Sequence, residues 1–369
     1  MAPANLAAAP GRVNLIGEHI DYHRLAVLPI ALDRRVTVEF HERGDNTIRA
    51  SSLGYGEREF EWTEDLQRAP KGDWENYLRA AARAITGKWG VGRGIEARVS
   101  SDLPAAAGLS SSSALIVAFS LALLKANGRE ASFADLMEIL PEGEQFVGTR
   151  GGGMDHAASL ASRAGCASWI EFDPIAVRHV PIPRDWRFLI AHSLTTAEKS
   201  GAARNEYNAR RAAGTAALSR LGAKSYREAL DPGLAKGLTD RHEHDSFLHV
   251  VTESFRVRQA VAAMEAADAG TFGKLLLESH ASLRDRLKVS SPALDRLVDC
   301  AMESGAMGAR LTGAGFGGCA VVFAGEGDVA AVRDGLVARY YVERAEFDPS
   351  AHLIDAHASD GALGKSASR

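Results

Sequence analysis

Cysteine, long apolar runs and an excess of charge of either sign are all missing from this sequence. Only three cysteines occur in 369 residues, an odd number at distant positions, so we expect no disulfide framework and favour a reducing cytoplasm. The N-terminus lacks the basic segment and apolar core of a signal peptide. The most apolar stretch, residues 114–124, is too short to cross a bilayer and predicts a buried helix.

The charge balance excludes several partners. A formal net charge of -4 leaves no basic footprint for nucleic acid or an anionic membrane surface, so we expect neither as a partner. Any site for phosphate must therefore be local, built from a loop or a helix end. The composition does not indicate an oligomeric state, and a monomer is compatible with it.

The usual nucleotide-binding motifs are also missing. Gly364 and Lys365 suggest a Walker A loop, but Ser359 stands where its first glycine belongs and too little chain follows for a helix. No protein-kinase signature occurs either. The glycine run 313–318 formally matches a dinucleotide fingerprint, but a strand-like run follows it where that fingerprint needs a helix. Conventional nucleotide-binding folds are therefore not expected.

The length and composition fit two globular domains with a cleft between them, since 46% of the residues are hydrophobic and 24% are charged. Breaker residues between 173 and 183 mark the expected boundary. We predict an N-terminal domain over residues 1–180 and a C-terminal domain over residues 181–356. The small, polar tail 357–369 is expected to fray.

Local periodicity predicts an α+β protein. Ser132 and Asp135 have the spacing of a capping box at a helix start. Strand-like runs alternate with helical patterns in both halves of the chain. The predicted strands are 36–40, 95–99, 186–191 and 319–323, and the predicted helices are 75–87, 112–126, 201–222, 246–268 and 292–304.

Glycine and serine gather where a strand is expected to lead into an apolar helix, in the segment Gly108-Leu109-Ser110-Ser111-Ser112. Free backbone amides and the dipole at a helix N-terminus favour an anion, and a serine hydroxyl there can reach a magnesium ion. Serine is also the ordinary capping residue, so taken alone the segment is equally consistent with a plain helix cap.

Polar side chains are dense in two further glycine-punctuated segments, residues 11–22 and 151–156. The first holds an arginine, a glutamate, a histidine and an aspartate, and the second puts a carboxylate beside a backbone that a ligand can approach closely. Ordinary capped turns would explain either segment by itself. The run 242–245 alternates histidine with acidic residues, but its spacing is not that of a metal motif and we predict no metal there.

Taken together and in this order, five segments resemble galactokinases, which belong to the GHMP kinases. They are residues 10–19, 108–112, 206–211, 279–285 and 311–319. The similarity runs from residue 10 to about residue 323. The resemblance implies a two-domain GHMP kinase fold of the α+β class, with an N-terminal domain like ribosomal protein S5 domain 2 and a ferredoxin-like C-terminal domain. It also implies an ATP- and Mg²⁺-dependent sugar kinase that converts galactose to galactose 1-phosphate.

The resemblance assigns roles to particular residues. Asp155 and Arg12 match the catalytic pair. The positions that match sugar-binding residues are Glu18, His19, Asp21, Gly152 and Tyr207. The positions that match the nucleotide loops are Gly108, Leu109, Ser110, Ser111, Ser112, Gly313 and Gly315. Ser112 matches the magnesium-binding serine. Gly143 occupies the place of the family's acidic ligand, so Glu144, or Glu142, is expected to substitute for it.

The sequence departs from the galactokinase pattern at Ile20, at residues 23–25 and at Gly153, all expected beside the sugar. A kinase for a related sugar or polyol, such as N-acetylgalactosamine, arabinose or a uronic acid, is therefore one alternative. A sugar and ATP sensor without catalysis is the other, although retention of Arg12 and Asp155 favours an enzyme.

Overall fold

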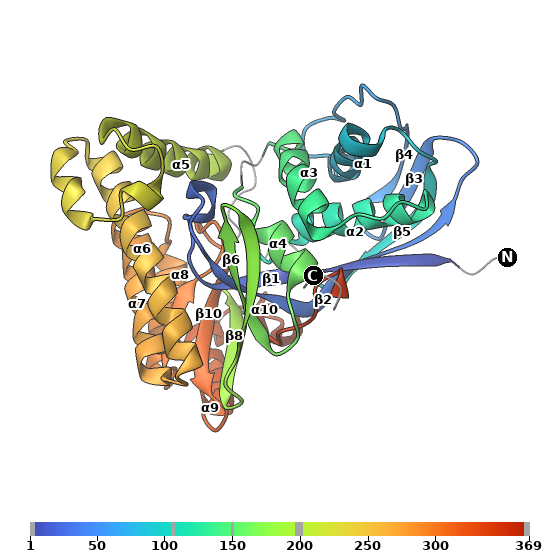
Figure 1. Cartoon of the computed structure of the whole chain (residues 1–369). Coiled ribbons are helices and arrows are strands. Elements are labelled where there is room, and N and C mark those ends of the chain that lie inside the picture. Colours follow the sequence, from blue (N-terminus) through green and yellow to red (C-terminus); the bar gives the residue numbers. More distant parts are fainter. Residues whose placement is uncertain (1–3, 105–107, 149–150, 196–201, 365–369) are drawn as a thin grey trace.

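The chain folds into two lobes, each with its own sheet and its own layer of helices (Figure 1). The computed structural model describes residues 4–104, 108–148, 151–195 and 202–364, and at 202–204 the backbone alone. The two sheets position the polar segments that the sequence analysis singled out.

The first lobe contains a five-stranded sheet of order β1-β2-β5-β3-β4. All neighbours are antiparallel except β3 and β5. Strands are β1 (Asn5–Ile16), β2 (Leu28–Glu42), β3 (Thr47–Ser52), β4 (Gly56–Glu61) and β5 (Ile95–Ser101). The helices of this lobe are α1 (Glu75–Trp89), α2 (Ser111–Ala126), α3 (Phe133–Phe146) and α4 (Met154–Ala161). The connection from β1 to β2 includes the short helix η1 (Asp21–His23).

Helix α2 is the central helix of this lobe. It packs on β1, β2, α1, α3 and α4, and residues on all its sides are buried. This confirms the buried helix predicted from the apolar run, and the predicted helix 75–87 and the capping box of Ser132 and Asp135 are also confirmed. Because α2 is apolar all round, its N-terminus is held at a fixed position between the sheet and α4.

A hairpin of β6 (Cys166–Phe172) and β7 (Ile175–Pro181) leads to the second sheet, whose order is β11-β8-β10-β9, all antiparallel. The strands are β8 (Trp186–His192), β9 (Gly308–Leu311), β10 (Cys319–Gly325) and β11 (Leu353–Asp355). The helices are α5 (Ala202–Arg220), α6 (Arg241–Glu265), α7 (Ala269–Asp285), α8 (Pro292–Glu303), α9 (Val329–Leu336) and α10 (Pro349–His352). Short η2 (Tyr226–Glu228), η3 (Pro232–Gly237) and η4 (Val337–Tyr341) join them.

Aromatic packing holds α7 against this sheet. Phe272 of α7 lies with its ring centroid 4.8 Å from that of Trp186 and 5.2 Å from that of Phe323. Phe188 and Phe323 stack across β8 and β10. Large buried rings contribute most to such a core, so α7 and the neighbouring α6 are firmly placed behind the sheet.

The C-terminal segment differs from its prediction. Residues 357–364 do not fray: Ala358 pairs with Leu32, and the amide of Gly361 donates to the carbonyl of Ser162. Small residues make this possible, since a Cβ at Gly361 would lie 2.4 Å from the carbonyl oxygen of Leu160. The rest of the predicted tail, residues 365–369, lies outside the described residues. The division into domains at residue 180 stays a prediction.

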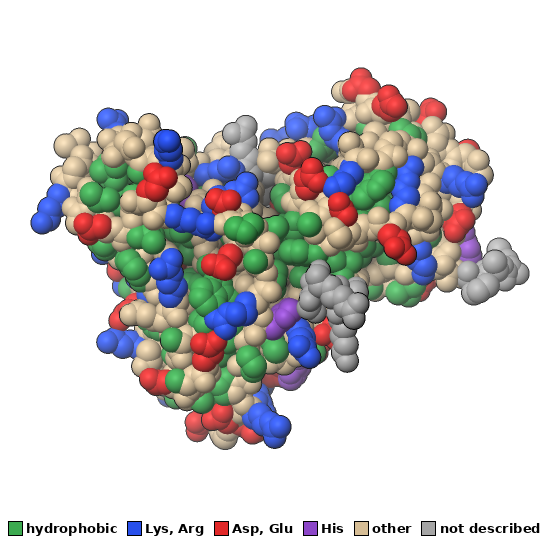
Figure 2. All heavy atoms as spheres, in the orientation of Figure 1, with side chains coloured by type: hydrophobic (Ala, Val, Ile, Leu, Met, Phe, Trp, Pro, Cys, Tyr) green, Lys and Arg blue, Asp and Glu red, His purple; other side chains and the backbone are tan. Residues whose placement is uncertain are grey.

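Acidic and basic side chains are interspersed on the face shown in Figure 2, as the near-neutral charge balance leads one to expect. Within the described ranges, every helix is too short or too polar to cross a membrane.

Candidate active site

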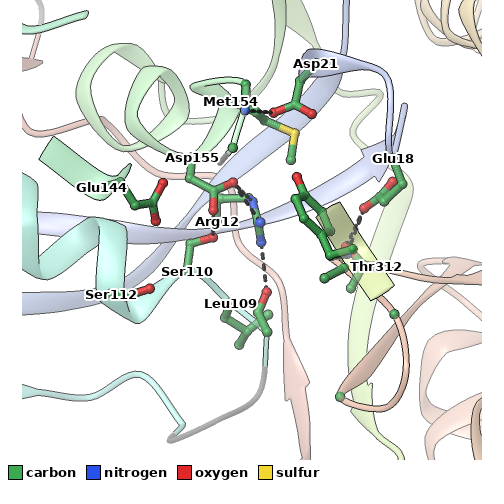
Figure 3. A pocket seen from close by; sticks show the side chains of 18 of the residues that line it. Arg12, Glu18, Asp21, Leu109, Ser110, Ser112, Glu144, Met154, Asp155 and Thr312 are labelled. Carbon is green, nitrogen blue, oxygen red and sulfur yellow. Dashed lines mark hydrogen bonds and ion pairs between the residues drawn. The ribbon is translucent and has the colours of Figure 1, made fainter. Parts of the chain in front are cut away.

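A cavity of about 300 Å³ lies where the two lobes meet, with walls from both. Every residue to which the sequence assigned a site role lines it, except Glu142, the alternative to Glu144. Those that line it are Arg12, Glu18, His19, Asp21, Gly108, Leu109, Ser110, Ser111, Ser112, Glu144, Gly152, Asp155, Tyr207, Gly313 and Gly315. Residues up to 303 positions apart in the chain are thus brought to one cavity, and Figure 3 labels ten of its lining residues.

Asp155 lies in the first turn of α4, at the centre of the cavity wall (Figure 3). Its Oδ1 accepts a hydrogen bond from Arg12 Nε at 2.7 Å, and Arg12 Nη2 also lies 2.7 Å from Oδ1. Its Oδ2 accepts from the Ser110 hydroxyl at 2.5 Å. The side chain of Asp155 remains 25% exposed, so a carboxylate held by a guanidinium and a hydroxyl still faces the cavity.

Arg12 also fixes the serine loop. Its Nη1 donates to the carbonyl of Gly108 at 2.9 Å, and its backbone amide donates to the carbonyl of Leu109 at 3.1 Å. The side chain of Arg12 is only 6% exposed. One buried cation therefore contacts both the loop that precedes α2 and the carboxylate of α4. Residues 105–107, which the sequence placed in the same loop, lie outside the described residues.

The segment between β1 and η1 forms a tight turn. Gly17 and His19 have positive φ angles, of 109° and 62°, which direct the chain from the strand into the cavity wall. Asp21 at the start of η1 accepts a hydrogen bond on Oδ2 from the amide of Gly152 at 3.0 Å. A Cβ at Gly152 would lie 2.3 Å from the Asp21 carbonyl carbon, so glycine is required for this contact.

Aromatic rings close one side of this turn. The ring of His19 lies 5.2 Å from that of Tyr207, and Tyr22 contacts both. His19 Nδ1 lies 2.9 Å from the Tyr22 hydroxyl, and Nε2 lies 3.1 Å from the carbonyl oxygen of Ala314. Burial lowers the pKa of His19 to about 3, so the ring is neutral at physiological pH.

Glu18 is occupied by the protein itself. Its Oε2 lies 2.5 Å from Arg310 Nη2 and accepts from Asn14 Nδ2, while Oε1 accepts from the amide of Gly313 at 2.9 Å and from Thr312 Oγ1. The residue is 2% exposed. Glu18 therefore joins the turn of the first lobe to the glycine loop of the second, and its role as a sugar ligand stays a prediction.

The residues predicted to bind magnesium lie on the side of Asp155 that is opposite to Glu18 (Figure 3). Ser112 is in the first turn of α2, and Glu144 reaches the cavity from α3 (Figure 3). Glu144 Oε1 accepts from Ser113 Oγ at 2.9 Å. Burial, with the nearby charge of Asp155, raises the pKa of Glu144 to about 7.

A divalent cation fits this pair. It would favour the ionised form of a carboxylate that is otherwise costly to charge. The part of the chain that the structure describes has no cluster of three or more histidine, cysteine, aspartate or glutamate residues able to hold a metal. Magnesium bound with a nucleotide needs only one or two protein carboxylates, so this does not weigh against the pair.

The departures from the galactokinase pattern lie mostly outside the cavity, contrary to the expectation. Ile20 and residues 23–25 do not line it. His23 packs against Tyr22 and Tyr226, behind the turn. Gly153 lines the cavity, but a Cβ there would point toward Met137 at 3.2 Å and Pro141 at 3.4 Å.

Some functional neighbours escaped the sequence reasoning. Arg310 is 0% exposed and donates to the carbonyls of Asn14 and Leu15 as well as pairing with Glu18. Its position just before the glycine run was the available signal. Tyr77 also lines the cavity and carries no signal that single-sequence reasoning could use.

Comparison with known proteins agrees with this geometry. Residues 76–163 match the GHMP kinases N terminal domain, residues 260–342 match the GHMP kinases C terminal domain, and residues 2–41 match the galactokinase galactose-binding signature. A galactokinase of Roseiflexus sp. (strain RS-1) is 34% identical over 97% of this chain and 92% of its own. The chain belongs to the galactokinases of the GHMP kinase family.

Further galactokinases support this family membership. One from Streptomyces coelicolor is 35% identical over 89% of this chain and 87% of its own. The crystal structure of Lactococcus lactis galactokinase complexed with galactose superposes with a TM-score of 0.88 and 26% identity, covering 97% of this chain and 94% of that one. The two-domain GHMP kinase fold implied by the sequence is confirmed, and ATP use follows from the family.

Proposed function

We propose that this galactokinase family member transfers the γ-phosphoryl group of ATP to the anomeric hydroxyl of galactose, giving galactose 1-phosphate and ADP. The observation that carries the proposal is the position of Asp155. Its carboxylate stands between the turn that holds Asp21 and the serine loop before α2, so it can meet a sugar hydroxyl on one side and a phosphate on the other.

Asp155 would accept the proton of the anomeric hydroxyl as that oxygen bonds to the γ-phosphorus and the bond to the β-phosphate oxygen breaks. Arg12, held against Asp155, places a fixed positive charge beside the transferred group and offsets charge on its oxygens. The amides and hydroxyls at the start of α2 would bind the phosphates. Magnesium held by Ser112 and Glu144 would supply charge neutralisation of the phosphates.

The polar groups of the turn between β1 and η1 favour a sugar over another alcohol as the substrate. Asp21, Tyr207 and the backbone at Gly152 present polar groups at one wall, and His19 and Tyr22 provide ring surface behind them. Buried polar groups that lose their partner are costly, so such a wall discriminates between sugars by which hydroxyls it can pair. His23 does not line the cavity, and a Cβ at Gly153 would point toward Met137, so these two departures do not favour a different sugar.

The test is ADP release with Mg-ATP across galactose, N-acetylgalactosamine, glucose, arabinose and galacturonic acid. The product is identified by phosphorus NMR as an anomeric phosphate, and the Asp155→Asn variant measures the background ATPase. A clear preference for galactose is expected. Preference for another sugar would reassign the specificity of the wall, and no turnover above background with any sugar would overturn the kinase proposal in favour of a sensor.

We also propose the cytoplasm as the compartment. ATP is supplied there, and the three cysteines are free thiols.

A further inference from the structure

Helix α6 contacts the sugar-binding turn from behind, through two side chains that do not line the cavity. His249 and Glu253 are one helical turn apart on α6, and both are 0% exposed. His249 Nε2 lies 3.0 Å from the carbonyl oxygen of Glu18, and Glu253 Oε1 accepts from the amide of Gly17 at 3.0 Å. These two bonds fix the backbone immediately before His19 and Asp21.

Each of the two side chains is held in turn by a serine of α7. Ser282 Oγ lies 2.9 Å from His249 Nδ1, and Ser279 Oγ donates to Glu253 Oε1 at 2.6 Å. Both serines are buried. They belong to the segment 279–285, which the sequence comparison with galactokinases singled out but to which no role in the reaction was assigned.

The chemistry of the His249 contact is unambiguous. A backbone carbonyl only accepts hydrogen bonds, so Nε2 must carry the proton and Nδ1 must accept from the Ser282 hydroxyl. Burial lowers the pKa of His249 to about 4, which is consistent with a single neutral tautomer. Ser282 of α7 therefore fixes the orientation of the His249 ring, and the ring in turn holds the Glu18 carbonyl in place.

The Glu253 contact is equally constrained. Arg256 Nε donates to Glu253 Oε2 at 2.7 Å, which leaves Oε1 for Gly17 and Ser279. Arg310 Nε donates to Ser279 Oγ at 3.1 Å, so this relay also meets the arginine that pairs with Glu18. Val257, one turn further along α6, lies 3.0 Å from where a Cβ of Gly17 would be.

We propose that His249 and Glu253, held by Ser282 and Ser279, are positioning residues that set the sugar-binding turn from behind. We define the two relays as Ser282–His249–Glu18 carbonyl and Ser279–Glu253–Gly17 amide. Their hydrogen bonds run to the turn, to Arg256 and to Arg310, and none of them reaches the described residues of the nucleotide loop before α2. They therefore act on sugar recognition. The inference rests on the proposed function in that the turn binds the sugar.

The test compares the KM values for galactose and for ATP in variants of His249. His249→Leu removes both hydrogen bonds and is expected to raise the galactose KM at least roughly tenfold, with the ATP KM within about twofold. His249→Gln can donate to the Glu18 carbonyl and accept from Ser282, so it is expected to restore the galactose KM to within about threefold. Thermal unfolding verifies that each variant is folded.

The serines give a milder version of the same test. Ser282→Ala and Ser279→Ala together are expected to raise the galactose KM roughly fivefold. The control is Ser120→Ala, which removes an equally buried hydroxyl from α2, outside both relays, and is expected to leave both KM values unchanged. This comparison decides the matter if His249→Leu does not fold.

Equal rises in both KM values, an unchanged galactose KM in a folded His249→Leu or in the double serine variant, or a His249→Gln no better than His249→Leu would overturn the proposal. Wild-type turnover with the sugar panel is measured first. If the chain phosphorylates a different sugar, the proposed substrate is wrong, and the relays are tested with that sugar instead.

Discussion

The two sides of the cavity are built in opposite ways. On the side proposed for the sugar, Gly17, Glu18, His19 and Asp21 are buried. Side chains of α6 and the amide of Gly313 in the glycine loop hold this segment. On the phosphate side, Gly108 is exposed, Ser110, Ser111 and Ser112 are partly exposed, and the loop is held chiefly by Arg12.

This difference reflects what each ligand demands. A sugar is told from its isomers by single hydroxyl groups, which requires polar groups fixed in a dry wall before binding. A triphosphate is recognised by its charge, which amides, a helix dipole and a cation supply without a closed wall. Substitutions on the sugar side should therefore alter sugar affinity or the stability of the fold. Substitution of Asp155, the carboxylate between the two sides, should alter turnover.

The largest effect is expected at the carboxylate that the two sides share. Asp155→Asn keeps the shape of the side chain but cannot accept the proton, and kcat should fall roughly 10³-fold while ATP binding is retained within about threefold. Steady-state kinetics and nucleotide titration measure the two quantities. Asp135→Asn, an acidic residue at the start of the neighbouring α3, is the control and should leave kcat unchanged. Retention of more than a tenth of the rate would remove Asp155 from the catalytic role.

The next largest effect is expected where the sugar side is tied to the second lobe. Arg310→Leu leaves Glu18 buried without its cation and should lower the free energy of unfolding by about 3–5 kcal/mol. Urea unfolding measures this. Arg284→Leu breaks an exposed pair with Asp285 on the same lobe and should cost about 1 kcal/mol or less. Equal losses of unfolding free energy in the two variants would show that the buried pair of Glu18 and Arg310 stabilises the fold no more than an exposed pair does.

A sharper test of the sugar wall is Gly152→Ala. The added Cβ would lie 2.5 Å from Asp21 Oδ2, so the contact between η1 and the loop that precedes α4 must open, and the galactose KM should rise roughly tenfold or more. The control is Gly87→Ala in α1, where nothing lies within 4 Å of the added Cβ, and it should leave the KM unchanged. An unaltered KM in Gly152→Ala would mean that Asp21 does not contribute to sugar binding in this conformation.

The smallest effect concerns pH. Because the pKa of His249 is about 4 in the folded chain and near 6.5 when unfolded, the unfolded chain binds an extra proton between these values. Stability from this group is complete above pH 6.5 and is lost as pH falls toward 4. Urea unfolding at pH 7.5 and 5.5 should show that His249→Gln loses about 1.4 kcal/mol less than the wild type. Equal losses would mean that the pKa of His249 is not lowered in the folded protein, so that its ring is protonated at pH 5.5.

The sequence by itself determined the features that depend on short-range chemistry. The apolar run 114–124 had to be a buried helix, and Ser132 with Asp135 had to cap the next one, since both depend on residues within a few positions of each other. The resemblance of separate segments to galactokinases also implied one shared cleft, and the candidate site residues line one cavity.

Only the tertiary structure decided what those residues do to one another. Glu18 reaches the amide of Gly313 across 295 residues of sequence, and His249 reaches the Glu18 carbonyl across 231. His23 and Gly153 looked like specificity residues because they are adjacent to the motifs, but His23 packs behind the turn, and a Cβ at Gly153, which lines the cavity, would point toward Met137. Periodicity and spacing report neighbours along the chain, whereas burial and hydrogen-bond partners are set by which helix faces pack together, and this depends on the whole fold.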